Sequence, residues 1–172
     1  MNLSFRSENS AKVLHLISVM PGIHLHEIQR ILGVSLSSVR YSVERLARSG
    51  RILRDRTTGY SRFYPVTISE KERVVYSLIR NRTTRKILYE LTQGSGSTNK
   101  ELAEKIGLAK STVSMHVHKL LQTNVAHLVL SEKGDFRIRI EDAEYVRKLL
   151  LKSEEFSKLS TMIANYTDLW NF

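Results

Sequence analysis

The sequence predicts a mainly α-helical fold with small β-hairpins, an α+β class, in which two similar domains precede a C-terminal helix. The first observation is an internal repeat: displaced by 74 positions, the chain matches itself without a gap, so that Glu27 falls on Glu101 and Gly33 on Gly107. The second is that the repeated positions are mostly apolar residues at helical spacing or turn glycines, so a fold is what repeats. The third is an alternating stretch around a turn at the end of each copy, which is typical of a β-hairpin.

The composition indicates a folded, cysteine-free protein. Of the 172 residues, 41% are hydrophobic and only 2 are proline, and this length accommodates two small domains. The absence of cysteine excludes disulfides, thiol catalysis and Cys-ligated metals. No apolar run approaches the roughly 20 residues that span a bilayer, and the first residues lack the apolar core of a secretory signal. We therefore expect a cytoplasmic protein with no membrane partner.

Each repeat predicts three helices separated by turns. They are expected at 10–19, 24–32 and 36–48 in the first copy, and at 84–92, 98–106 and 110–122 in the second. Gly33 and its counterpart in the second copy end the second helix in a tight turn. The third helix then carries apolar residues at i, i+4 and i+7, which are Val39, Val43 and Leu46 in the first copy. This stripe predicts which face of the third helix is buried.

The hydrophobic period changes after each third helix. Residues 51–56 and 61–66 flank a turn with Gly59, and residues 127–130 and 136–140 flank a turn with Gly134. Both stretches predict β-hairpins. A further helix, opened by the capping box Ser69-Glu70-Lys71-Glu72, is expected between the two copies. The predicted divisions are a first domain at 1–68, a helical linker at 69–83, a second domain at 84–148 and a C-terminal helix at 149–172.

Two helices joined by a tight glycine turn and followed by a hairpin form a winged helix-turn-helix. ELAEKIGLAKSTVSMHVHKL and HEIQRILGVSLSSVRYSVERLARSGRI resemble the helix-turn-helix core of winged-helix transcriptional regulators of the ArsR and MarR kind. The tandem layout is similar to that of archaeal regulators with two such domains. The resemblance implies a DNA-binding regulator that works as a homodimer and contacts bases with the early residues of each third helix.

The third helices, at 36–48 and 110–122, are the candidate recognition helices. Their polar side suits the major groove, where arginine pairs with guanine through two hydrogen bonds and serine donates or accepts. The alternative is an ordinary solvated helix face. The predicted DNA-binding residues, including those of the first hairpin, are Ser37, Ser38, Arg40, Tyr41, Arg45, Arg54, Arg56, Arg62, Lys110, Ser111, Thr112, Ser114, Met115 and Lys119.

The charge distribution favours DNA as the partner and the first domain as the stronger contact. The chain has 27 Lys+Arg and 17 Asp+Glu, a net charge of +10. Such a field attracts polyanions, whereas a surface that serves solubility alone usually mixes both signs. Residues 1–66 have a net charge of +6 and residues 84–150 only +3. The first hairpin is rich in arginine, while the tip of the second is nearly neutral, so the second domain could contact either DNA or protein.

The C-terminal segment has heptad spacing. Leu149, Phe156, Ile163 and Trp170 recur every seven residues, and other apolar residues lie between them. This pattern predicts a helix that dimerises, although a helix that packs on its own domain would show a similar stripe. A two-fold dimer would favour palindromic half-sites. The predicted dimerisation residues are Leu149, Phe156, Leu159, Ile163, Tyr166 and Trp170.

The sequence offers neither a metal site nor a catalytic centre. His116 and His118 stand two positions apart, which on a helix points them about 200° from each other, so one ion cannot take both. No carboxylate pair and no cysteine accompanies His24 and His26 to complete a site. No nucleophile elbow and no phosphate-binding loop is present. We expect no enzyme and no cofactor.

Two other binding functions stay open. One is a tandem winged-helix adaptor that docks on proteins in a chromosome-organising or transcription-initiation complex. An arginine-rich first hairpin is not expected of a pure adaptor. The other is RNA binding, but the sequence shows no aromatic-bearing sheet of the kind that stacks single-stranded bases.

Overall fold

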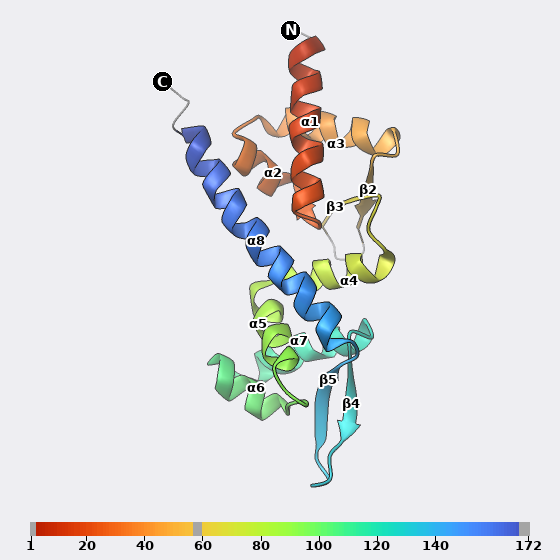
Figure 1. The fold of residues 1–172 in the computed structure, drawn as a ribbon, viewed down its shortest axis with the longest axis vertical. Helices are drawn as coiled ribbons and strands as arrows, with labels where there is room; N and C mark the ends of the chain where they lie inside the picture. Colours follow the sequence, from red (N-terminus) through yellow and green to blue (C-terminus); the bar gives the residue numbers. More distant parts are fainter. Residues whose placement is uncertain (1–2, 57–59, 169–172) are drawn as a thin grey trace. The chain divides into compact units, whose positions relative to one another are not determined.

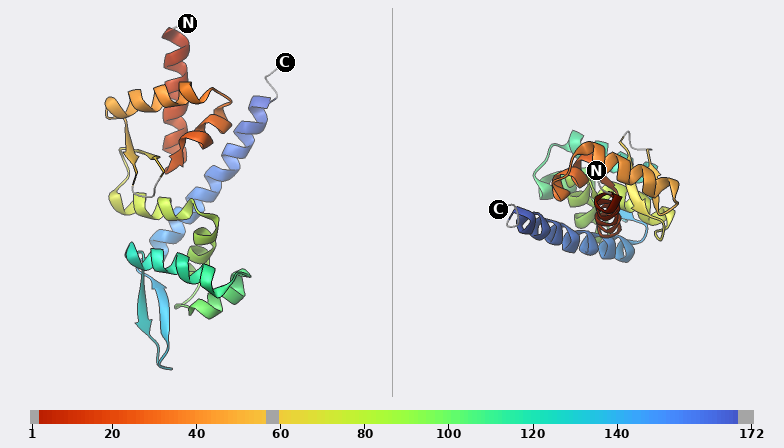
Figure 2. Two further views of the ribbon diagram at one scale, coloured as in Figure 1. Left: turned by 180° about the vertical axis from the view of Figure 1, so that it is seen from behind. Right: turned by 90° about the horizontal axis from the view of Figure 1, so that it is seen from above.

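Figure 1 shows the computed structural model of the chain, and Figure 2 gives two further views. The structure describes the backbone of residues 3–56 and 60–168, and the side chains of 8–56, 60–155 and Lys158. The chain forms two compact units. Unit 1 comprises residues up to Arg73 and those from Ser153 onward, and unit 2 comprises Val74–Lys152.

Unit 1 contains the first helix-turn-helix and its hairpin. Its elements are α1 (Leu3–Val19), β1 (Ile23–His24), α2 (Leu25–Leu32), α3 (Leu36–Arg48), β2 (Ile52–Asp55) and β3 (Arg62–Pro65). The strands form an antiparallel sheet in the order β1-β3-β2. The core gathers the apolar faces of the three helices and one face of the sheet; Ile17, Ile28, Val39 and Phe63 are at most 1% exposed.

Local signals in the sequence fix the helix boundaries of unit 1. The Nδ1 atom of His24 accepts from the backbone N–H of Glu27 and begins α2. Gly33 then ends α2 at φ 63°, in the left-handed region that favours glycine. Ser35 caps α3, because its Oγ accepts from the backbone N–H of Ser38 at 3.2 Å. These caps set where α2 and α3 begin and where α2 ends, and so place the tight turn of a helix-turn-helix between the two helices.

Unit 2 repeats this arrangement. The elements that follow β3 are α4 (Glu70–Ile79), α5 (Arg82–Thr92), α6 (Asn99–Ile106), α7 (Lys110–Gln122), β4 (Ala126–Leu130), β5 (Phe136–Ile140) and α8 (Ala143–Asp168). The predicted capping box of Ser69 is present and begins α4. A second capping box, at Thr98, begins α6. Val113, Val117 and Leu120 of α7 are at most 3% exposed. The unit boundaries fall within α4 and α8.

The structure confirms the predicted fold class, with eight helices and two small antiparallel sheets in the described residues. Two features differ from the expectation. Helix α1 begins at Leu3 rather than at Ser10, and the short strand β1 pairs with β3, a contact between residues about 40 positions apart. In the part of the chain that the structure describes, every helix is too short or too polar to cross a bilayer.

Candidate nucleic-acid interface

Helix α3 buries its apolar stripe and exposes its polar side. Val39, Val43 and Leu46 are at most 3% exposed. The exposed residues of the other face are Ser37, Arg40, Tyr41, Glu44, Arg45 and Arg48. The structure therefore brings together on one exposed helix face all the predicted α3 residues except Ser38, which is half-buried beside the cap residue Ser35.

A shallow hollow of about 410 Å³ runs along the first turns of α3. Leu36, Ser37, Arg40, Tyr41 and Glu44 line it. Glu44 was not among the predicted site residues, although its position one turn after Arg40 could have indicated it. A carboxylate repels phosphates but accepts a hydrogen bond from the amino group of cytosine. The face thus carries both a donor and an acceptor for base edges.

The hairpin that we call wing 1, formed by β2, β3 and the turn between them, exposes arginine. Arg54 lies opposite Phe63 in the strand register, and its guanidinium carbon is 5.9 Å from the centre of the Phe63 ring. Its Nε donates to Ser61 Oγ at 3.1 Å. Arg54 and Arg56 are both exposed, and residues 57–59 lie outside the described part of the chain. Packing and a hydrogen bond therefore hold the Arg54 side chain on the strand while its charge faces solvent.

The third predicted arginine of wing 1 has a different role. Arg62 is half-buried, and its Nη1 donates to the carbonyl oxygen of Gly22 at 2.9 Å. Unit 2 repeats the contact, since Nη1 of Arg137 donates to the carbonyl oxygen of Gly96 at 3.1 Å. The guanidinium group of Arg62 is turned toward the domain, where it ties the hairpin to the turn before α2. A contact between Arg62 and DNA stays a prediction.

Helix α7 presents a face with fewer cations than α3. The exposed residues of this face are Lys110, Ser111, Ser114, Met115, His118 and Lys119, while Thr112 is half-buried. Met115 is 64% exposed. His116 lies on the inner side, where its Nδ1 is 2.9 Å from Thr84 Oγ1 of α5. Burial lowers the pKa of His116, and the nearby Lys119 lowers it further. His116 thus contributes to the packing of α7 on α5.

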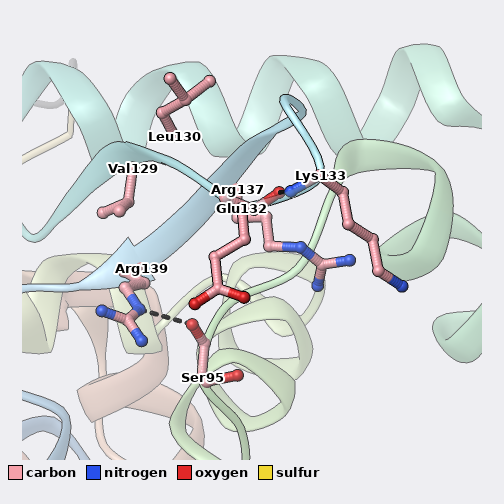
Figure 3. Close-up of a pocket in the computed structure, with 8 residues that line it drawn as sticks. Ser95, Val129, Leu130, Glu132, Lys133, Arg137 and Arg139 are labelled. Carbon is pink, nitrogen blue, oxygen red and sulfur yellow. Dashed lines mark hydrogen bonds between the residues drawn. The ribbon is translucent and has the colours of Figure 1, made fainter.

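The hairpin that we call wing 2, formed by β4, β5 and the turn between them, directs its two arginines to partners within unit 2. Arg137 donates to both carboxylate oxygens of Glu101, at 2.9 and 3.3 Å, and its Nε lies 3.4 Å from Asp135. A hydrogen bond from the backbone N–H of Thr98, with Arg137 as a further cause, lowers the pKa of Glu101. Arg139 donates to the carbonyl oxygen of Ser95 (Figure 3). These arginines serve the fold of unit 2.

The other face of wing 2 is apolar and exposed. Leu128 lies opposite Ile138, and Leu130 lies opposite Phe136. Ile138 is buried, but Leu128, Leu130 and Phe136 are 51%, 62% and 64% exposed. Figure 3 shows Leu130 directed away from the guanidinium groups of wing 2. We call these three exposed residues the apolar wing patch. The predictions did not include it, although the alternation of leucine along 126–130 could have revealed it.

The predicted dimerisation residues lie mostly outside the described side chains. Leu149 is 4% exposed, so it is buried in its own chain and is removed from the predicted dimer surface. Helix α8 includes Phe156, Leu159, Ile163 and Tyr166, whose side chains are not described, and Trp170 lies beyond the described residues. The dimer therefore stays a prediction.

The histidines serve the fold or face solvent. His24 caps α2, and His127 Nδ1 lies 2.8 Å from a carboxylate oxygen of Glu141. Among the described side chains, no group of three His, Asp or Glu is placed to hold a metal ion.

Comparisons with known proteins bear on both units. Residues 80–125 match a family model described as a winged helix-turn-helix DNA-binding domain, and residues 7–76 match one described as an N-terminal HTH domain. Comparison with curated proteins found no match. A solution NMR structure of a protein from Bacteroides thetaiotaomicron is 27% identical and covers 38% of this chain and 80% of its own, with a TM-score of 0.36.

A crystal structure of a conserved hypothetical protein from Chlorobium tepidum is 13% identical and covers 82% of this chain and 95% of its own, with a TM-score of 0.29. The two matched domains, one in each half of the chain, agree with the fold of the two units. The chain is a tandem winged helix-turn-helix protein of the DNA-binding regulator type.

Proposed function

We propose that the chain is a sequence-specific transcription regulator that binds double-stranded DNA mainly through unit 1. In this proposal α3 enters the major groove and wing 1 contacts the phosphate backbone. The main support is the exposed face of α3, which carries Arg40 and Arg45, while the apolar stripe of the helix is buried. Arg54 and Arg56 of the same unit are exposed as well.

The chemistry of α3 supports base recognition. The guanidinium of Arg40 can donate two hydrogen bonds to guanine, and Ser37 can donate to or accept from a neighbouring base. Glu44 can accept from cytosine, and it disfavours a non-specific approach to phosphates. A face that carried only cations would bind any duplex. The mixture of donors and an acceptor supports a sequence preference.

Wing 1 supplies the electrostatic part of the affinity. Contacts to phosphates position a protein on the duplex without reading its sequence. Arg54 and Arg56 are exposed near the tip of the hairpin, where a wing reaches the backbone or the minor groove. In unit 2, α7 offers Lys110, Ser111, Ser114 and Lys119 as a weaker, second contact.

We also propose that the regulator is a homodimer in the cytoplasm, joined through its C-terminal helix. The heptad spacing from Phe156 to Trp170 supports this pairing. Two like copies related by a two-fold axis would read palindromic half-sites about 34 Å apart or a multiple of that distance.

The test is a binding titration with random and selected duplexes at several salt concentrations. Contact with about five phosphates gives a slope near −4.5 for log K against log salt, and selected duplexes should bind far more tightly than random ones. Lys12→Ala serves as the control, because Lys12 is an exposed cation on α1 that pairs with Glu8 at 2.7 Å. A chain that ignores duplexes at low salt would overturn the proposal.

A second candidate function is a protein adaptor. The apolar wing patch favours it, because exposed Leu128, Leu130 and Phe136 suit a protein partner better than a phosphate backbone. An adaptor would show weak duplex binding that does not depend on base sequence. The same titration therefore separates the two functions.

A further inference from the structure

We propose that β4 of wing 2 pairs with β4 of a second copy of the chain. The two strands would run antiparallel about a two-fold axis beside Leu128, and the two hairpins would become one four-stranded sheet. This pairing is separate from the proposed helical dimer, and it does not depend on DNA binding.

The free edge of β4 is the first observation. In the described part of the chain, β4 pairs with β5 alone. The other edge of β5 is bridged by Ser97, whose N–H donates to the carbonyl oxygen of Ile138 at 3.1 Å and whose carbonyl accepts from the Ile138 N–H at 2.9 Å. Figures 1 and 2 agree that β4 is the outer strand of unit 2. An unpaired edge is a template for another strand.

The alternation of hydrogen-bonded pairs in the hairpin shows which backbone N–H and C=O groups of β4 point to its free edge. The N–H of Ser131 donates to the carbonyl of Asp135, and the N–H of Glu141 donates to the carbonyl of Val125. The hydrogen-bonded pairs of the hairpin therefore use the odd-numbered residues of β4. The N–H and C=O groups of the even-numbered residues, Ala126, Leu128 and Leu130, point outward.

The register of a second, antiparallel copy of β4 matches these outward groups. With the two-fold axis beside Leu128, each Leu128 exchanges two hydrogen bonds with its copy, and Ala126 exchanges two with Leu130 of the other chain. The apolar wing patches of both copies then lie on the same face of the joined sheet. The strand thus complements itself in both main chain and side chains.

Charge argues for a second copy and against DNA as the occupant. The strand AHLVL has no Lys, Arg, Asp, Glu or Pro, although exposed edges are usually protected by charges or proline. Two chains of net charge +10 repel each other over most of their surface, but β4 brings no like charges together. The tip of wing 2 carries Glu132, Lys133 and Asp135, so it lacks the excess of positive charge that would draw it to phosphates.

The size of the patch indicates a weak pairing. Three partly exposed apolar side chains amount to on the order of 300–400 Å² per copy, below the roughly 800 Å² per partner of a standard stable interface. The contact would therefore be reversible at micromolar concentrations. It gains strength when a second restraint, such as the C-terminal helix, already holds two copies together.

The absence of cysteine from the chain allows a direct test. Leu128→Cys places two thiols across the axis, where the Cα atoms of a hydrogen-bonded antiparallel pair are about 5.5 Å apart, within the range that a disulfide spans. Tyr89→Cys is the matched control, since Tyr89 is 49% exposed on α5 and Leu128 is 51% exposed. Both proteins are oxidised mildly without DNA, and covalent dimers are followed on non-reducing gels.

We expect Leu128→Cys to form dimers at least tenfold faster than Tyr89→Cys. Val129→Cys, on the opposite face and one residue off the axis, should lie between them. Equal rates for all three variants would overturn the proposal. Protection of the Leu128→Cys thiol from a labelling reagent by duplex DNA would also overturn it, because the patch would then face DNA.

A second measurement uses a charge instead of a thiol. Sedimentation of the unmodified chain between about 10 and 500 µM should show a rising mean mass, since weak pairing is populated only at high concentration. Leu128→Lys should abolish this rise, or leave only the part that is due to the dimer formed through the C-terminal helix. Tyr89→Lys should leave the rise unchanged. A rise that survives Leu128→Lys in full would contradict pairing through β4.

Discussion

In wing 1, Arg54 and Arg56 precede the turn, whereas wing 2 has Leu128 and Leu130 at the same positions, 74 residues later. The register supports this correspondence, because Arg54 lies opposite the buried Phe63 and Leu128 lies opposite the buried Ile138. The two wings therefore share a framework and differ in the side chains that face solvent.

The supports of the two wings are also alike. Arg62 and Arg137 each donate to a glycine carbonyl in the turn before the second helix of their unit. The outward face is thus free to vary while the anchor stays the same. A shared winged-helix fold therefore does not by itself decide the partner of each unit, and the two wings differ in the chemistry of their exposed positions.

Exchanging those positions should have the largest effect. Arg54→Leu with Arg56→Leu removes two phosphate contacts, so we expect roughly 10- to 100-fold weaker binding to every duplex at about 0.1 M salt, and a salt slope that is smaller by about 2. Fluorescence anisotropy with selected and random duplexes measures both quantities. A loss confined to the selected duplex would contradict the role of wing 1.

The reciprocal exchange, Leu128→Arg with Leu130→Arg, tests whether the same two positions determine the partner of wing 2. It gives wing 2 the two charges of wing 1 and should not weaken duplex binding. It should abolish self-association through β4, because the two-fold axis would then bring like charges together. Retained self-association would show that these positions do not set the partner.

A single recognition residue should matter less for affinity and more for sequence preference. Arg40→Ala removes a donor pair from α3, with an expected cost of roughly 1–3 kcal/mol at one base pair only. Ser114 occupies the corresponding position in α7, and Ser114→Ala should cost less. Binding-site selection with each variant measures this. If Arg40→Ala weakens all sequences equally, Arg40 contacts phosphate instead.

The anchor arginines should affect stability and not DNA affinity. Arg62→Ala leaves the carbonyl of the buried Gly22 without this donor, and we expect a loss of about 1–3 kcal/mol in the free energy of unfolding. Arg137→Ala should act similarly on unit 2. Chemical denaturation measures the loss, and duplex binding at a temperature where both variants are folded provides the control. Weaker binding by folded Arg62→Ala would restore Arg62 to the interface.

The fold was predictable wherever the signal was local. The apolar stripes of α3 and α7, Gly33 and the cap at Ser35 are read from a few neighbouring residues, and the predicted bounds of α3 and β5 agree with the structure. Strand β1 could not be predicted in this way, because two residues become a strand only through pairing with β3.

The sequence predicted which face of α3 is exposed, but it did not predict the hydrogen bonds that the candidate DNA-binding residues make within the chain. The stripe of α3 established which residues point outward, so Arg40 and Arg45 are exposed as expected. The hydrogen bond of Arg62 could not be predicted, because its partner, the carbonyl of Gly22, lies 40 residues away in the sequence. The repeat could have indicated a structural role, since an arginine directly precedes the buried residue of the last wing strand in both copies, Arg62 before Phe63 and Arg137 before Ile138.

The smallest expected effect distinguishes the two units by pH. Ser10 Oγ of α1 donates to Ser42 Oγ of α3 at 3.4 Å, and 74 residues later the same two positions hold Thr84 and His116. Burial lowers the pKa of His116 below its ordinary value, so the unfolded chain binds a proton more readily. The stability that unit 2 gains here is complete above about pH 6.5 and is lost as the pH falls below it.

Thermal unfolding between pH 7.5 and 5.5 checks this prediction. His116→Asn keeps an acceptor near Thr84 but cannot titrate, so part of the acid-induced loss of Tm should disappear. His118→Asn is the control, because His118 is exposed on the same helix. Ser42 cannot titrate in this range, and the unfolding of unit 1 should therefore lack this contribution. An equal change in both histidine variants would mean that the pH dependence belongs to the surface and not to the contact between α5 and α7.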